Sequence, residues 1–253
     1  LWDSDKDFFK LQAGVKDLQI TRVTKLIPKL VLANYLDFTL NGQVNMEISL
    51  DGLVKASSFN LRAKGAQIKG NSFWPNSLNL ESLAVKGRYH SDPELFEIDN
   101  LQINTNGPKI SVKASLVNVG EEITVNGDTI VNELVLSQLK TYWPPNIGRD
   151  ARNWVSENMQ VRTAEENRMS FSLRIALFSK PRIFVNSLSG NLKLRDVTIN
   201  YMDTVPVIEN LHATAVFTSD RFLASVTEAN SGGLQIRSGT VRLLDLSSSL
   251  SLI

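Results

Sequence analysis

Few side chains in this sequence are of the types that carry out covalent or metal chemistry. The chain has no cysteine, which excludes disulfides, thiolate metal sites and a cysteine nucleophile. Its two histidines are His90, in a predicted turn, and His212, on the polar face of a predicted strand. Neither histidine has the close His, Asp or Glu spacing of a metal site, and a catalytic histidine also needs an orienting acid and a nucleophile. Both are interpreted as surface residues.

Clustered charges offer the remaining candidates for chemistry. Adjacent carboxylates, as at Glu121-Glu122 and Glu165-Glu166, could act as general acid and base, but in polar turn segments they are typical of solvated loops. Arg149, Asp150 and Arg152 stand together at the start of a predicted helix, where a solvated helix face is favoured over an anion site. We therefore predict a protein that is not an enzyme and that needs no metal or cofactor.

Composition and charge narrow the class of protein further. The chain has 253 residues, 42% of them hydrophobic, which is enough for a real core. Twenty-seven basic residues nearly balance 26 acidic ones, so there is no electrostatic footprint for nucleic acid. No apolar run approaches the roughly 18 residues of a membrane span. The chain starts without Met and ends within an alternating segment, so we expect a fragment of a longer protein.

Alternation of apolar and polar residues with a period of two dominates the sequence. This period is typical of strands with one apolar and one polar face. Turn signals such as Asn41-Gly42, Asp51-Gly52 and Gly232-Gly233 separate these runs at short intervals and favour antiparallel meanders. The clearest apolar stripes are Val44, Met46, Ile48 and Leu50; Ile110, Val112, Ala114 and Leu116; Met169, Phe171, Leu173, Ile175 and Leu177; and Leu211, Ala213, Ala215 and Phe217.

One region, at about 133–159, breaks the pattern. Apolar residues there recur at helical spacing, and Pro144-Pro145 separates two short predicted helices. Asn132 and Asn146 are the candidate N-caps. Three aromatic residues near the helix ends are interpreted as anchors that hold the helices on the sheet. These anchors are Tyr142, Trp143 and Trp154.

An antiparallel sheet with this many one-sided strands must cover its apolar face. It can close as a sandwich, or curl into a half-pipe that leaves a hydrophobic groove suited to acyl chains. The pattern alone favours the sandwich, because that architecture is commoner.

Two stretches favour the half-pipe. Residues 142–155, YWPPNIGRDARNWV, resemble the signature of YhdP-like proteins in the AsmA-like superfamily. The order of strands downstream, from Leu188-Ser189-Gly190 to Gly239-Thr240-Val241, is similar to the β-rich module of the same family. The match covers roughly 132–246. Across 1–131 only the general AsmA-like style of alternating strands is present.

The resemblance implies a mainly β protein whose elongated, curved antiparallel sheet forms a taco-like half-pipe. It divides the chain into an AsmA-like segment, 1–131, and a YhdP-like module, 132–253, within one continuous sheet. It further implies a periplasmic location, an inner-membrane anchor outside this chain, envelope protein partners, and transport of phospholipid between the inner and outer membranes. The candidate groove residues are Met169, Phe171, Leu173, Ile175, Leu177, Leu192, Leu194, Leu211, Ala213, Ala215 and Phe217.

Two alternatives stay open. The domain could be a structural or adaptor module in outer-membrane assembly, with a closed core and no ligand. A carbohydrate-binding sandwich is less favoured, because it needs exposed aromatic residues on one face and only 8% of residues are aromatic.

Overall fold

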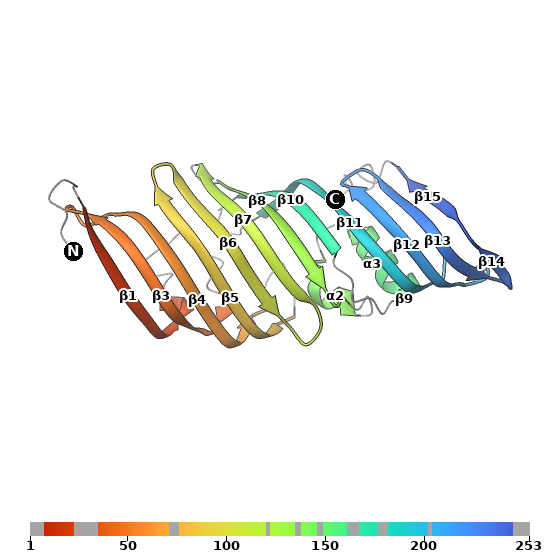
Figure 1. Ribbon diagram of the computed structural model, residues 1–253, viewed down its shortest axis with the longest axis horizontal. Helices are drawn as coiled ribbons and strands as arrows, with labels where there is room; N and C mark the ends of the chain where they lie inside the picture. Colours follow the sequence, from red (N-terminus) through yellow and green to blue (C-terminus); the bar gives the residue numbers. More distant parts are fainter. Residues whose placement is uncertain are drawn as a thin grey trace.

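The computed structural model describes residues 8–22, 35–70, 76–119, 122–134, 138–145, 149–160, 167–176, 182–201 and 204–244. Mainly β structure is confirmed: these residues form one long antiparallel sheet of fifteen strands that is not closed, with a few short helices (Figure 1). The groove candidate Leu177 and the candidate cap Asn146 lie outside the described residues. No helix within the described ranges is both long and apolar enough to cross a membrane.

The strands follow the order of the chain with few exceptions. The first half contains β1 (Phe8–Gln19), β2 (Leu36–Asp37), β3 (Thr39–Ser49), β4 (Val54–Ile68), β5 (Leu78–Ser91), β6 (Glu94–Asn104), β7 (Lys109–Val119) and β8 (Glu122–Asn132). The second half contains α2 (Leu139–Tyr142), α3 (Arg149–Asn158), β9 (Met159–Gln160), β10 (Asn167–Ala176), β11 (Arg182–Ile199), β12 (Ile208–Thr218), β13 (Phe222–Ser231), β14 (Leu234–Ile236) and β15 (Gly239–Leu243).

Antiparallel pairing of sequence neighbours builds almost the whole sheet, as the short turns predict. The short strands β2, β9 and β15 pair with β4, β11 and β13. Strand β8 pairs directly with β10, so the sheet continues across the predicted boundary at 131/132.

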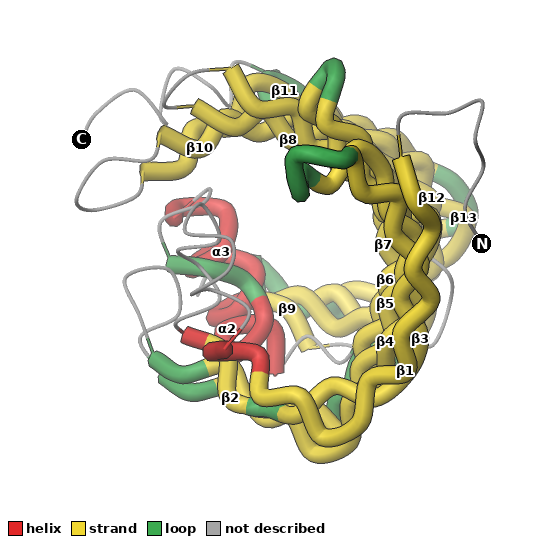
Figure 2. The backbone as a smooth tube through the Cα atoms, turned by 90° about the vertical axis from the view of Figure 1, so that its left-hand side faces the viewer, coloured by secondary structure: helices red, strands yellow, loops and turns green. Residues whose placement is uncertain are grey.

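The sheet curls about its long axis. Viewed along that axis, the strands follow an arc that is open on one side, and α2 and α3 lie in the opening (Figure 2). The sandwich that the pattern alone favours is therefore not formed: the described strands belong to one sheet rather than two.

Two short helices are present in the region predicted to be helical. The candidate cap Asn132 is the last residue of β8, where it pairs with Lys109 of β7. The first helix has four residues and the second has ten. The prediction of Asn132 as an N-cap was wrong, because strand pairing with β7 makes it the last residue of β8.

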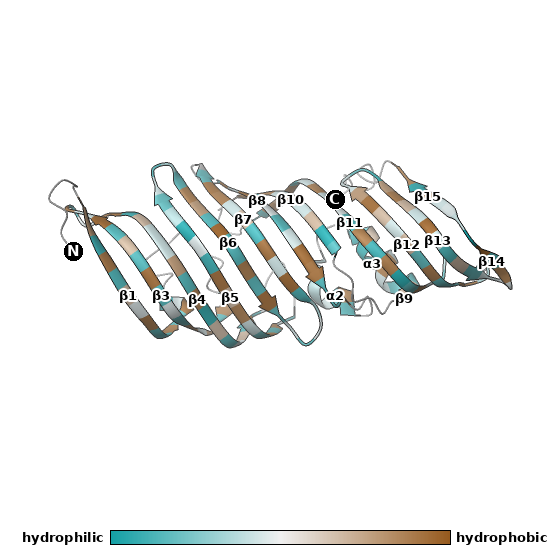
Figure 3. Cartoon of the chain, viewed as in Figure 1, coloured by the Kyte–Doolittle hydropathy of each residue, from teal (hydrophilic) through white to brown (hydrophobic). Residues whose placement is uncertain are grey.

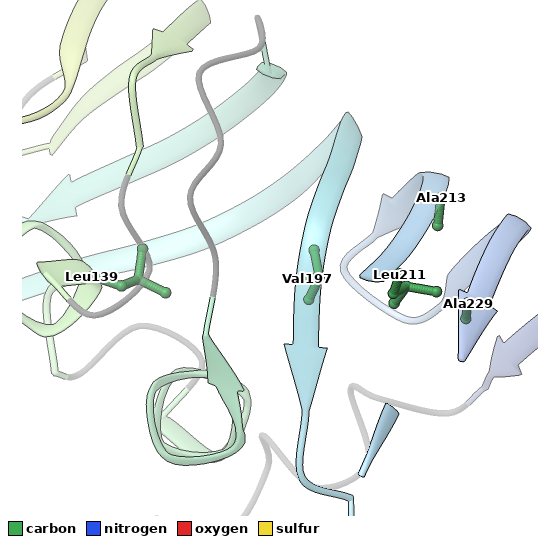
Figure 4. Close-up of a cluster of buried hydrophobic side chains, with 5 residues drawn as sticks. All are labelled: Leu139, Val197, Leu211, Ala213 and Ala229. Carbon is green, nitrogen blue, oxygen red and sulfur yellow. The ribbon is translucent and has the colours of Figure 1, made fainter. Parts of the chain in front are cut away.

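Buried side chains gather in two clusters. One joins β3, β4 and β5 around Leu40, Ala63 and Leu80. The other joins α2 to β11, β12 and β13 and contains Leu139, Val197, Leu211, Ala213 and Ala229 (Figure 4). Among the described residues, neither cluster includes a side chain from β7, β8 or β10.

Two hairpin turns are held by an aspartate. The Ser49 hydroxyl donates a hydrogen bond to Asp51, and the Thr218 hydroxyl donates one to Asp220. These bonds favour the ionised carboxylate and are the largest cause that lowers the pKa of each aspartate below 3.8.

A group whose pKa is lowered by folding stabilises the folded state above its unfolded pKa, and this contribution is lost as the pH falls through the folded value. We therefore expect both turns to weaken below pH 3.8. NMR titration of the carboxyl carbons measures this, and Ser49→Ala should move the Asp51 midpoint upward while leaving Asp220 unchanged. A midpoint for Asp51 unaffected by Ser49→Ala would contradict the assignment.

The shape itself is measurable in solution. A compact chain of this length has a radius of gyration of about 18 Å. Because the strands stack along one axis around an open interior, we expect small-angle X-ray scattering of the monomer to give a clearly larger value. A value at or below that of the compact chain would mean that the arc collapses in solution.

Candidate functional site

The cross-strand register decides which side chains share a face, because residues directly opposite each other in an antiparallel pair point the same way. On β10, Met169 lies opposite Gly190 of β11, and Phe171 lies opposite Leu188. A bulge then shifts the register so that Leu173 lies opposite Val185 and Ile175 opposite Ile183. The apolar side chains of both strands therefore stay on one face through the bulge.

The stripes on β11 and β12 lie on this same face. Gly190 pairs with Phe217, Leu192 with Ala215, and Leu194 with Ala213. Every groove candidate that the structure describes is therefore brought together on one side of the sheet, which we call the apolar face.

One row of the apolar face crosses the sheet from β1 to β15. It takes one residue from each of twelve strands, each directly opposite the next, and we call it the long row. Its only polar member is Thr129, which is 8% exposed. The row consists of Val15, Gly42, Leu61, Val85, Leu101, Val112, Thr129, Met169, Gly190, Phe217, Phe222 and Leu243.

The sequence-based list of candidates missed the first half of the chain. The register places further stripes of β1 and β3–β8 on the apolar face, among them Val44 and Met46 of β3 and Ile110 and Val112 of β7. The same alternation was visible there in the sequence and could have identified them. Bands of high hydropathy recur along these strands (Figure 3).

The apolar face is the concave one. Residues Leu139 and Trp143 of the helical region pack with Val197 and Leu211, which belong to this face. Figure 2 places α2 and α3 inside the arc. The apolar side chains therefore line the interior of the curled sheet.

This interior is only partly covered. Although β7, β8 and β10 lie in the middle of the sheet, side chains such as Leu116, Val125, Met169 and Leu173 are only half-buried. A dry core would bury such residues almost completely. The central part of the apolar face is therefore only partly buried: these side chains remain partly accessible, whereas Thr129, Val131 and Ile175 of the same face are buried.

Three phenylalanine rings of the apolar face lie over a glycine on the neighbouring strand. The pairs are Phe59 with Gly87, Phe171 with Gly127, and Phe217 with Gly190. A Cβ atom added at Gly127 would lie 2.7 Å from the Phe171 ring and 2.7 Å from the Lys113 carbonyl oxygen. The glycine therefore lets the ring lie along the sheet, a device known to support strand pairing.

Replacing one of these glycines should destabilise the fold. Gly127→Ala collides with backbone as well as with a ring, so we expect it to lower the free energy of unfolding by about 1–3 kcal/mol, as overpacking does. Gly14→Ala on β1 is the matched control, because no atom lies within 4 Å of its added Cβ. Urea denaturation of both variants measures the difference. Equal stabilities would contradict the packing role of Gly127.

The three predicted aromatic anchors differ in their surroundings. Trp143 is half-buried and packs against the cluster around Val197. The Thr105 hydroxyl donates a hydrogen bond of 3.3 Å to the Tyr142 hydroxyl oxygen. Trp154 is 39% exposed, and its ring meets Tyr201 edge-on at 6.3 Å between centroids.

Arg152 links the two helices. Its Nε atom donates to the Trp143 carbonyl and its Nη2 atom to the Lys140 carbonyl, both at 2.8 Å. These are carbonyls at the end of α2 that lack a helical partner. Lys140 and Glu157 add an ion pair at 3.2 Å. The side chain of Arg152 is thus occupied in holding α2 against α3, whereas Arg149 is exposed.

The residues weighed for catalysis are placed apart from the apolar face. His212 Nε2 lies 3.0 Å from Asp196 Oδ1, and His90 Nε2 lies 4.0 Å from Glu97 Oε2. Glu122 forms an ion pair of 2.6 Å with Arg174. Glu121 and Glu165-Glu166 lie outside the described residues. In the part of the chain that the structure describes, no three His, Asp or Glu residues gather as metal ligands.

The opposite, convex face carries charged side chains and a few exposed apolar ones, such as Val216 and Leu223. Ion pairs such as Lys10 with Glu47 at 3.4 Å join its neighbouring strands. A depression of about 580 Å³ lies over β6–β12, and its lining mixes charged side chains such as Lys113, Asp128 and Arg168 with members of the long row such as Val112, Met169 and Phe217. Because the apolar face has fewer charged side chains than this lining, it is the stronger candidate for binding an acyl chain.

The fold and the site together define an open antiparallel β-sheet protein with a concave apolar face. Comparison with protein-family models, curated proteins and solved structures finds no match to this chain.

Proposed function

We propose that this chain carries phospholipid, with the acyl chains against the apolar face and the head groups toward the open side of the arc. The observation that carries the proposal is the long row, which offers an apolar side chain on nine of its twelve strands, with glycine on two and Thr129 on the remaining one. The partial exposure of side chains on the central strands also supports the proposal, because the protein's own core does not bury this surface completely.

The energetics of an acyl chain suit such a surface. Each buried CH2 group contributes about 0.8 kcal/mol, so a lipid that leaves a bilayer for the apolar face exchanges one apolar environment for another at little cost. Because similar side chains repeat from strand to strand, neighbouring positions along the row have similar free energies. A lipid can then move along the sheet without meeting one deep trap.

The resemblance of residues 142–155 to YhdP-like proteins supports a cellular location for this activity. We propose a periplasmic segment that carries phospholipid between the inner and outer membranes, tethered to the inner membrane by a part of the protein outside this chain and working with envelope protein partners. The competing role is a structural or adaptor domain in outer-membrane assembly.

Lipid extraction and mass spectrometry of the gently purified protein test the proposal. We expect phospholipid to co-purify in an amount comparable to the protein, and a fluorescent phospholipid to bind the delipidated chain. A protein that carries no phospholipid and binds none in that assay would overturn the carrier role and favour the adaptor role.

A further inference from the structure

The helical region narrows the apolar face at one place. We use the term helical unit for α2, α3 and β9 together. Its residues Leu139, Trp143, Val155 and Met159 pack with the cluster that includes Val197. This packing covers only one half of the apolar face on β11, β12 and β13.

The division runs across all three strands. The covered side chains are Leu194, Val197 and Ile199 of β11; Ile208, Leu211 and Ala213 of β12; and Val226 and Ala229 of β13. The side chains of the same face outside the cluster are Ile183, Val185, Leu188 and Leu192 of β11, Ala215 and Phe217 of β12, and Phe222 and Ala224 of β13. The long row passes through this second set.

The width left free decreases along the sheet. On β8 the half-buried part of the apolar face runs from Ile123 to Gly127, about 13 Å at about 3.3 Å per residue, because Thr129 and Val131 are buried. On β12 only Ala215 and Phe217 lie outside the cluster, two residues apart or about 7 Å. A ligand moving from β8 toward β13 therefore meets a surface about half as wide.

The helical unit is held in this position at both ends. At one end, Tyr142 accepts the hydrogen bond from Thr105, in the turn between β6 and β7. At the other end, Met159 and Gln160 of β9 pair with Ile199 and Thr198 of β11. The unit therefore reaches from the β6–β7 turn to β11 and is built into the sheet.

We propose that the helical unit is the width-determining element of the lipid path, which confines a passing phospholipid to the half of β11–β13 that contains Leu192, Ala215 and Phe217. This inference rests on the proposed function. It assigns a selective role to the unit, because a bulky or multiply acylated lipid that fits the open face on β8 would not fit the narrowed part.

Two positions on β11 provide a matched test. Leu192 and Leu194 are the same residue type, two residues apart on the same face, but only Leu194 packs against the cluster. Because the chain has no cysteine, Leu192→Cys and Leu194→Cys each give a single thiol. The rate of maleimide labelling is measured for the full chain with and without a monomeric short-chain phosphatidylglycerol.

With lipid at about ten times its dissociation constant, labelling at position 192 should slow about tenfold, since only the unbound fraction reacts. Labelling at position 194 should not change with lipid, because the helical unit already covers it. Adding Tyr142→Ala, which removes the attachment to Thr105, should make position 194 respond to lipid as well. Circular dichroism confirms that each variant is folded.

The outcomes separate the two proposals. If lipid protects neither position, the carrier function itself is overturned, and the narrowing of a lipid path with it. If lipid protects both positions equally in the chain with an intact helical unit, lipid binding stands and the width-determining role is overturned. If Tyr142→Ala leaves position 194 insensitive while the variant stays folded, the attachment at Thr105 does not hold the unit in place.

Discussion

Leu173→Asp should abolish the co-purification of phospholipid while the protein still folds. Leu173 lies on the apolar face between Val125 of β8 and Val185 of β11, and it is only half-buried. A carboxylate at this position keeps contact with water on the open side of the arc, so the folded state tolerates it. An acyl chain crossing the same position would remove that water, and burying an unpaired charge costs several kcal/mol.

Ser172→Asp is the control for this substitution. It adds the same charge at the adjacent residue, which points to the opposite face of β10, so lipid content should stay at the wild-type level. Lipid mass spectrometry and thermal melting by circular dichroism are measured on both variants. An unfolded Leu173→Asp chain would indicate a closed core at this position, and a folded one with normal lipid would show that Leu173 lies off the lipid path.

Trp143→Ala should destabilise the protein far more than Trp154→Ala. Trp143 packs against the cluster around Val197, so its truncation should cost about 3 kcal/mol, at the lower end for a large aromatic residue because it is only half-buried. Trp154 is 39% exposed and contacts Tyr201, so its truncation should cost about 1 kcal/mol, the value of an aromatic pair.

Chemical denaturation of the two single variants measures this difference, and both replace the same residue type in the same helical region. A loss for Trp154→Ala as large as that for Trp143→Ala would mean that α3 is held on the sheet mainly by Trp154. An unchanged stability for Trp143→Ala would remove it as an anchor of α2.

The sequence predicted the strands well because each one-sided strand carries its own period of two. The stripe from Met169 to Ile175 and the stripe from Leu211 to Phe217 could be recognised separately. Periodicity within one strand does not determine the register between strands, and so it does not determine which stripes share a face. Bulges such as that between Leu194 and Val197 change which residues of β11 face inward, and they depend on pairing with β12.

The two-helix region likewise shows that local sequence does not determine which residues pair in the sheet. Asn132 has the residue type of an N-cap, yet pairing with Lys109 makes it the end of a strand. Helix propensity over four residues cannot compete with a ladder of cross-strand hydrogen bonds. The curvature of the sheet was likewise not encoded in any single segment, since a sandwich and a half-pipe need the same alternation.

The long row also has a consequence for how such a protein can change in length. Each strand contributes one rung, and each antiparallel hairpin contributes two rungs that face the same interior. Duplication or loss of a whole hairpin would therefore shift the end of the sheet by about 10 Å, two strand spacings, without altering the cross-section or the facing of any other strand. The length of the sheet and the chemistry of its apolar face can thus evolve independently. The length changes with the number of hairpins, and the chemistry changes by substitution of the residue that each strand contributes to the long row.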